Sequence, residues 1–345
     1  MDQGTLVTIA DLAARVGASS RDVALVLAGD PRVPVELHRL IADAIEASGY
    51  RPLQAVQAQL GRPLRLAIVF KTYGGDDPEA NRFYTPIASA IALACARHGT
   101  EIVQAMMVVD DHYELVEIPE VMLDGRSDGA FVIGAQLSAQ AVERVRAATC
   151  PIVLVDGYSE GDILDSVVTD NVAGARMAVE HLFDAGHREI AILGTEPVCY
   201  PSIQARRAGY VEALEARSLR THFIDASYVL TATVAALGVD YLQRQPEVTA
   251  LFGANDLITV AFMEMARGAG LRIPGDVSVV GFDDMDVASL AMPALTTLAI
   301  DKTLMARAGF ALLTHRLEAL ATDPLTAIVT PRLVERESVV PPGRR

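Results

Sequence analysis

The spacing of apolar positions along the chain changes near residue 64. Before that point, apolar residues recur every three or four positions in three short stretches, as they do on the buried face of a helix. The third stretch, 35–48, stops at Gly49. The inward positions are Ile9, Leu12, Ala13 and Val16; then Val23, Val26 and Leu27; then Leu37, Ile41, Ala44 and Ile45. The pattern predicts three small helices that close one miniature core.

Polar residues mark where the first two of these helices begin. Thr8 with Asp11, and Ser19 with Asp22, match the capping box, in which a hydroxyl and a carboxylate satisfy free backbone N–H groups. Gly17 lies between the two helices, where the chain must turn sharply. This arrangement indicates a helix-turn-helix.

After residue 64, short apolar runs alternate with helical stretches. Such repeated βαβ units predict an α/β fold with two doubly wound parallel-sheet lobes, and such sheets bind ligands beyond the carboxyl ends of their strands. The expected strands are 64–70, 101–109, 128–134, 151–157, 166–170, 189–194, 248–253, 277–284 and 295–300, and the expected helices are 86–97, 139–148, 172–185, 203–216, 256–269 and 303–321.

The domain organisation that we expect follows from this change of pattern. A helix-turn-helix domain occupies 1–52, a hinge occupies 53–63, and a two-lobed ligand-binding and dimerisation domain occupies 64–345. The hinge is compatible with either a short helix or an extended linker. A chain of 345 residues with 51% hydrophobic residues is large enough for such cores.

Composition adds expectations about location and partners. The chain has no apolar run of about 18 residues and no secretory signal pattern, so we expect a cytoplasmic protein without membrane contact. Its three cysteines, Cys95, Cys150 and Cys199, fit reduced thiols better than a disulfide framework. The net charge of −15 argues against broad nucleic-acid affinity. Residues 1–62 are near neutral, with six arginines against seven acids, and form no basic patch.

The order and spacing of several motifs together resemble the LacI/GalR family of bacterial transcriptional repressors, over essentially the whole chain. The head carries T-I-x-D-L-A-x-x-x-G-x-S, V-x-x-V-L and I-E-x-x-G-Y-R-P. The body carries VVTDN, HLFDAGHREIAILG, RRAGY, GANDLIT, IPGDVSVVGFDD and PALTTL.

The resemblance implies an effector-responsive repressor, a homodimer that places its second helix in the major groove of a pseudo-palindromic double-stranded DNA operator. Arg21 would read guanine through a bidentate contact. The hinge segment would fold on DNA and push a leucine into the minor groove. The DNA-binding residues carried over on this basis are Thr8, Ser19, Ser20, Arg21, Leu25, Tyr50, Gln57, Gln59 and Leu60.

The sequence departs from the family pattern in the head and the hinge. Asp22, Ala24 and Leu25 stand where the family has two hydroxyl residues and an arginine. Gln59 stands where the wedge leucine is expected, and Leu60 comes one residue late. Each lost phosphate contact lowers affinity and its salt dependence. We therefore expect weak DNA binding or an operator that is read differently. The alternative is a sugar-sensing protein of the same descent with weakened or lost DNA binding.

The same resemblance places a small-molecule effector, expected to be a sugar or glycoside, in the cleft between the lobes. The Arg206 guanidinium suits hydroxyls, a carboxylate or a phosphate, and Asp283 could accept from adjacent sugar hydroxyls. Two assignments stay open, because Phe83 also fits a core residue and Asp170 also fits a helix cap. The predicted ligand-binding residues are Tyr73, Phe83, Asp170, Arg206, Asn255 and Asp283.

Two other classes share parts of this pattern. A transport-associated binding protein would have the two lobes, but the head and the missing secretory signal disfavour it. The chain lacks the phosphate-loop, dinucleotide-binding, nucleophile-elbow and zinc-protease motifs, so we expect no enzyme, no catalytic residues and no cofactor. His181 and His187 have the wrong spacing for a shared metal, and no metal site is predicted.

Overall fold

The computed structural model describes residues 6–72, 82–109, 115–161, 163–227, 231–319 and 323–343. The chain divides into two compact units, and it passes between them three times. Unit 1 comprises Met1–Val168 and Asp301–Val329, and unit 2 comprises Thr169–Ile300 and Thr330–Arg345. No described helix meets the length and hydropathy that a membrane crossing requires.

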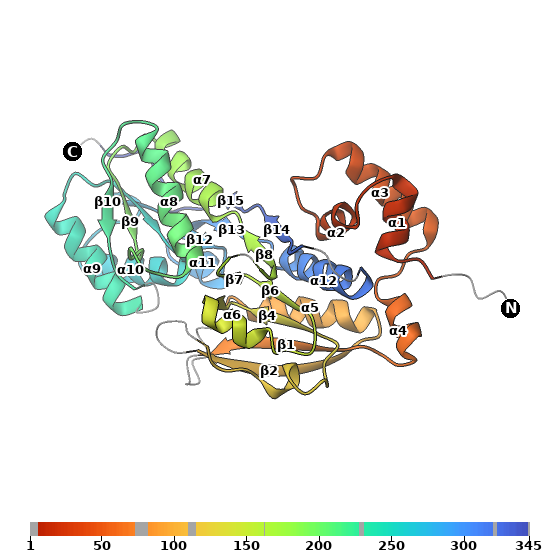
Figure 1. Ribbon diagram of the computed structural model, residues 1–345. Helices are drawn as coiled ribbons and strands as arrows, with labels where there is room; N and C mark the ends of the chain where they lie inside the picture. Colours follow the sequence, from red (N-terminus) through yellow and green to blue (C-terminus); the bar gives the residue numbers. More distant parts are fainter. Residues whose placement is uncertain are drawn as a thin grey trace. The chain divides into compact units, whose positions relative to one another are not determined.

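Unit 1 begins with the predicted three-helix head, drawn in red in Figure 1. Its helices are α1 (Ile9–Val16), α2 (Ser20–Ala28) and α3 (Val35–Ser48). Both capping boxes form: the Thr8 side chain accepts from Asp11 N, and the Ser19 side chain accepts from Asp22 N. Gly17 adopts the left-handed conformation, with φ 67°, which a residue without Cβ does most easily.

The core of the head matches the expected apolar faces. Ile9 of the first expected face, Val23 of the second and Ile41 of the third are all fully buried. The buried members of this core are Ile9, Leu12, Ala13, Val23, Val26, Ile41 and Tyr50. A small core of this kind fixes the angle between α1 and α2.

The segment after the head is helical. Leu53 adopts a left-handed conformation, with φ 64°, and α4 (Gln54–Leu60) follows it and ends at Gly61. Of the two states that the sequence left open for this segment, the structure has the short helix.

The body of unit 1 is a doubly wound sheet. Its order, β14-β8-β6-β4-β1-β2-β3, has its switch point between β1 and β4, where the winding direction reverses. The strands are β1 (Arg65–Thr72), β2 (Glu101–Val109), β3 (Leu115–Glu117), β4 (Gly129–Ile133), β6 (Ile152–Val155), β8 (Asp165–Thr169) and β14 (Thr326–Val329). The other elements are α5 (Thr85–Arg97), η1 (Glu120–Met122), α6 (Ala139–Val145), α12 (Lys302–Glu318) and a small pair, β5 (Gln136–Leu137) with β7 (Tyr158–Ser159).

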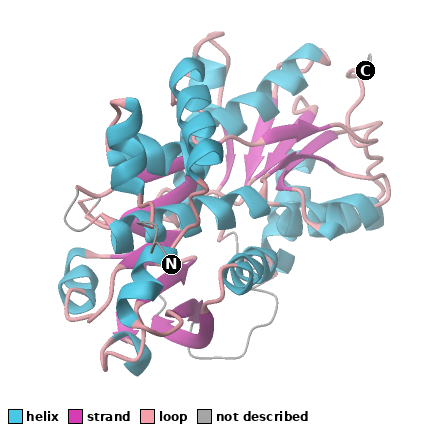
Figure 2. Cartoon of the chain, turned by 90° about the vertical axis from the view of Figure 1, so that its right-hand side faces the viewer, coloured by secondary structure: helices cyan, strands magenta, loops and turns pink. Residues whose placement is uncertain are grey.

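Unit 2 repeats this architecture with strand order β10-β9-β11-β12-β13-β15, in which only β15 pairs antiparallel among the described pairings. Helices flank the strands of both sheets (Figure 2). The strands are β9 (Ile190–Leu193), β10 (His222–Ile224), β11 (Ala250–Gly253), β12 (Ser278–Asp283), β13 (Thr296–Ala299) and β15 (Arg332–Val334). The helices are α7 (Asn171–Asp184), α8 (Pro201–Glu215), α9 (Thr231–Arg244), α10 (Asp256–Gly268) and α11 (Asp286–Leu290).

Helix α12 is buried along almost its whole length, from Met305 to His315 apart from Arg307. Its Gly309 lies against Val155 of the sheet, and Phe310 stacks on His98 at the end of α5. A helix that is apolar on all sides must be covered on all sides. The remaining side of α12 is covered by the head, as Figure 1 shows for α2.

Candidate nucleic-acid interface and effector site

The start of α2 presents the residues predicted to read DNA. Arg21 is exposed, and Ser20 and Leu25 are half-buried. Asp22 is held as a cap, because its carboxylate accepts from Ser19 N at 3.0 Å and from Ser19 Oγ at 2.6 Å. This leaves Arg21 as an exposed cation at the capped start of α2.

Other predicted DNA contacts are engaged within unit 1. Tyr50 is buried, and its hydroxyl donates to Glu318 at 3.1 Å. The Gln57 side chain donates to His98 O at 3.0 Å and accepts from Leu64 N at 3.4 Å. Thr8 and Ser19 serve as helix caps, and Gln59 and Leu60 are exposed on α4.

Two of the predicted effector residues, Arg206 and Asp283, form a buried pair in unit 2. Arg206 Nε donates to Asn171 Oδ1 at 2.9 Å, Nη1 donates to Ala254 O at 2.5 Å, and Nη2 donates to Asp283 Oδ1 at 2.9 Å. The guanidinium lies 3.8 Å from the ring centroid of Phe282. Parallel strands bring their carboxyl ends to one edge, and Ala254 follows β11 while Asp283 ends β12. The sequence predicted Arg206 and Asp283, and Asn171 is an addition.

The backbone around Asp283 is unusual. Asp283 has φ 109° and Asp284 has φ 48°, both in the region that disfavours residues with a Cβ. Asp284 is held by Arg336, whose Nη2 lies 2.6 Å from its carboxylate. Behind them, burial and then the nearby charge of Asp283 raise the pKa of Asp256 to about 8. Strained backbone and a perturbed carboxyl are typical of binding sites.

Two other predicted ligand residues act as helix caps. Asp170 accepts from Ala173 N at 3.0 Å at the start of α7, and Asn255 accepts from Ile258 N at 3.0 Å at the start of α10. The cap interpretation of Asp170 therefore holds, and Asn255 has the same local task. Asp170 follows the carboxyl end of β8, and Asn255 follows that of β11.

The matching edge of the unit 1 sheet carries aromatic and charged groups. Tyr84 donates to Asp156 at 3.2 Å, and the Phe83 ring packs edge-on against Tyr84. Lys302 Nζ lies 5.1 Å from the centroid of the half-buried Phe83 ring. Burial lowers the pKa of Lys71 to about 8, and the nearby Asp156 opposes that shift. Tyr73 lies outside the described residues.

Several of these residues escaped the sequence prediction. Lys71 reads as the end of an apolar strand, and its place beside the β1/β4 switch point is the signal that could have marked it. Asn171 and Lys302 read as first residues of helices. Their roles depend on partners far away in the sequence.

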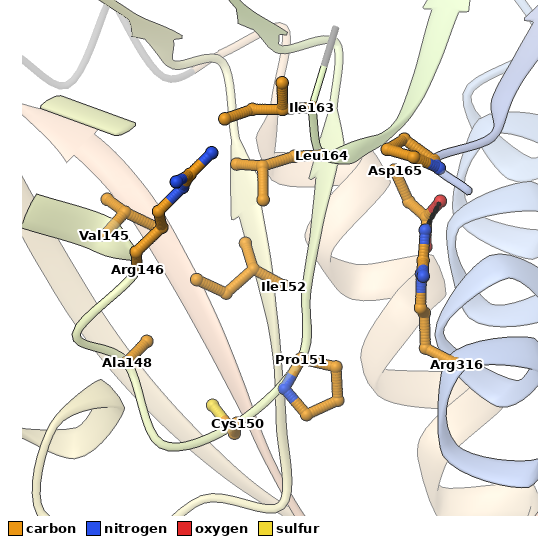
Figure 3. A pocket seen from close by; sticks show the side chains of 11 residues that line it. Val145, Arg146, Ala148, Cys150, Pro151, Ile152, Ile163, Leu164, Asp165 and Arg316 are labelled. Carbon is orange, nitrogen blue, oxygen red and sulfur yellow. Dashed lines mark hydrogen bonds and ion pairs between the residues drawn. The ribbon is translucent and has the colours of Figure 1, made fainter. Parts of the chain in front are cut away.

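A separate cavity of about 410 Å³ lies in unit 1. Figure 3 shows Ile152, Ile163 and Leu164 at its centre and the ion pair of Asp165 with Arg316 on one side. It contains none of the predicted effector residues. Within the described part of the chain, no group of His, Cys, Asp and Glu side chains could hold a metal ion.

Comparison with known proteins finds relatives over nearly the whole chain. Residues 179–339 match the periplasmic binding protein-like domain. The regulator MalR of Streptomyces coelicolor is 30% identical, covering 98% of this chain and 98% of its own. The regulator CelR of Thermobifida fusca is 27% identical over 98% of this chain and its full length, and both are called HTH-type transcriptional regulators. A solved CelR–cellobiose complex superposes with a TM-score of 0.68, at 25% identity, over 96% of this chain and all of that one.

Proposed function

Because this chain belongs to the LacI/GalR family of HTH-type transcriptional regulators, we propose that it binds a pseudo-palindromic operator as a homodimer and represses transcription. We further propose that a sugar or glycoside binds at the carboxyl ends of the body strands and changes the affinity for DNA. Its relatives are transcriptional regulators and not enzymes.

The observation that carries the proposal is the Arg206 cluster, in a chain that also has a capped helix-turn-helix. A carboxylate has about four lone-pair sites, so Asp283 can accept from a ligand hydroxyl while it keeps Arg206. The ring of Phe83 offers an apolar face of the kind on which sugars stack. The cellobiose in the CelR complex supports the same ligand class.

The DNA-binding part is tested with DNA that flanks the protein's own gene. Fluorescence anisotropy across a salt series would compare this DNA with unrelated DNA of equal length. We expect tighter binding to the flanking DNA, and Arg21→Ala should weaken that binding selectively. Arg97→Ala, which removes an exposed arginine on α5, is the matched control. Equal and negligible binding to both DNAs, with or without sugars, would favour the sugar-sensing alternative.

The effector part is tested by calorimetry with a panel of mono- and disaccharides. We expect one of them to bind the wild type and to shift its DNA affinity by the reciprocal factor that linkage demands. Asp283→Asn should weaken sugar binding at least tenfold. If Asp283→Asn binds the sugar as tightly as wild type does, Asp283 does not contact the sugar. Sedimentation of the free protein tests the homodimer.

A further inference from the structure

The buried side of α2 is larger than the core of the head can explain. Ala24 is fully buried and Ala28 is 1% exposed, yet neither belongs to the buried core of the head. A Cβ built on Gly29 would lie 2.8 Å from Arg307 Nη2 and 3.0 Å from Leu304 Cδ1, both on α12. The second covering of α2 is therefore α12 of the same chain, as Figure 1 shows.

The covered face of α2 lies next to the residues predicted to contact DNA. Residues four apart lie on one side of a helix, so Ser20, Ala24 and Ala28 form a single stripe. Arg21 and Leu25 border this stripe directly. A helix with its side chains is about 10 Å across, so a major groove cannot receive α2 while α12 lies against it.

Glu318, at the end of α12, holds the head on one side. It accepts from Ile9 N at 2.9 Å, from Tyr50 Oη at 3.1 Å and from Leu53 N at 2.8 Å. Ile9 is the first residue of α1, and its N–H has no partner inside that helix. One carboxylate thus ties together α1, the end of the head and the residue that precedes α4.

Asp30 makes the reciprocal contact on the other side. Its buried carboxylate accepts from Ile328 N of β14 at 3.0 Å and from Arg32 Nη2 at 2.7 Å. Arg32 Nη2 also donates to Thr326 O. Two carboxylates, Glu318 of the body and Asp30 of the head, therefore hold the head against the body on either side of the α2–α12 contact.

We propose that this contact is a resting, DNA-incompetent state, in which the recognition face of α2 docks on α12 of its own chain under the hold of Glu318 and Asp30. Operator binding then requires release of the head, and the observed DNA affinity is the affinity of the undocked form multiplied by the fraction of molecules that are undocked. This inference rests on the proposed DNA-binding function.

Docking is tested first without DNA. Arg32→Cys and Thr326→Cys, in a Cys150→Ser, Cys199→Ser background, would be treated with a disulfide-containing bis-maleimide of about 10 Å span. Cys95 is buried and stays. We expect a high yield of the intrachain product, and a much lower yield with Arg32→Cys paired to Glu143→Cys on α6. Glu318→Ala should lower the yield of the first pair at least fivefold. Equal yields for the two pairs would overturn docking.

The DNA consequence is tested with the same molecules. The cross-linked first pair should lose binding to the flanking DNA, and reduction of the linker should restore it. Glu318→Ala alone should bind that DNA at least fivefold more tightly than wild type. Glu143→Ala removes the same charge from an exposed position on α6 and should leave the affinity unchanged.

The outcomes separate the two proposals. If the cross-linked first pair binds DNA as tightly as it does after reduction, the proposed resting state is wrong, but the proposed function as a DNA-binding regulator still stands. If no form binds any DNA, the proposed operator binding fails, and the claim that docking controls DNA affinity is overturned with it. The linking yields then report separately on whether the contact exists in solution.

Discussion

The carboxylates of Asp283 in unit 2, which is buried, and of Glu318 in unit 1, which is half-buried, both accept hydrogen bonds within the protein, but their donors differ in charge. Asp283 faces the charged guanidinium of Arg206, and the side chains of the pair are 9% and 6% exposed. Glu318 faces two backbone N–H groups and one hydroxyl, all of them neutral. Hydrogen bonds offset part of the free energy of burying a charge, and an opposite charge adds a Coulomb attraction that neutral donors lack.

The pKa of Glu318 indicates how its contact with the head depends on pH. Burial raises the pKa of Glu318 above its ordinary value, although the three donors and their hydrogen bonds oppose the shift. A raised pKa means that the docked state favours the protonated acid, so docking weakens as pH rises through the shifted value. The contacts of Glu318 with the head therefore contribute most to docking at low pH and contribute less as pH rises.

The largest expected effect comes from removing the charge partner in unit 2. Arg206→Met leaves Asp283 buried without its cation, and breaking a buried pair in this way lowers the free energy of unfolding by about 3–5 kcal/mol. Urea denaturation of the full chain measures it. Arg176→Met is the control, because Arg176 pairs with Glu212 on the half-exposed surface of the same unit and should contribute at most about 1 kcal/mol. Equal losses in both variants would contradict the comparison.

Measuring stability as a function of pH tests the charge environment around Asp283, through its neighbour Asp256. The pKa of Asp256 is raised to about 8, so the folded state favours its neutral form. Its contribution to stability is complete below the ordinary pKa of 3.8 and is lost as pH rises toward 8, by roughly 1.4 kcal/mol per pH unit.

The variant that isolates this contribution is Asp256→Asn. An amide can donate to Thr297 Oγ1 and accept from Met285 N, the two groups that now donate to the carboxyl group. The variant should flatten the dependence of unfolding free energy on pH between 5 and 8. Asp240→Asn, at an exposed ion pair on α9, should leave the dependence as in wild type, and a wild-type slope in Asp256→Asn would remove Asp256 as its source.

Local signals in the sequence predicted the regular elements well. Thr8 and Ser19 predict the starts of their helices because a cap acts within three residues. The alternation of strands and helices follows from the spacing of apolar residues, which is also a local signal. The segment with β10 and α9 was missed, since a three-residue edge strand such as His222–Ile224 gives almost no pattern.

Partners far apart in the sequence explain the rest. Arg206 and Asp283 were each predicted, but their pairing across 77 residues was not. Glu318 reads as a solvated acid at a helix end, and its partners lie 265 to 309 residues away. The all-round burial of α12 has the same origin, because no local pattern says that a separate head will cover one of its sides.

The smallest expected effect comes from removing a single atom, the Tyr50 hydroxyl oxygen, from the contact between Glu318 and the head. Tyr50→Phe deletes one neutral donor to Glu318 and keeps the ring in the head core. Loss of one of the three donors should cost about 1 kcal/mol, or roughly a fivefold shift toward the undocked state, whereas Glu318→Ala removes the acceptor of all three and should shift the equilibrium further. The linking yield of Arg32→Cys with Thr326→Cys should fall accordingly, while Tyr241→Phe in unit 2 should not change it. If Tyr50→Phe lowers the linking yield as much as Glu318→Ala does, the Tyr50 hydroxyl stabilises docking and the two backbone donors do not. Docking at Glu318 would then depend on one side chain.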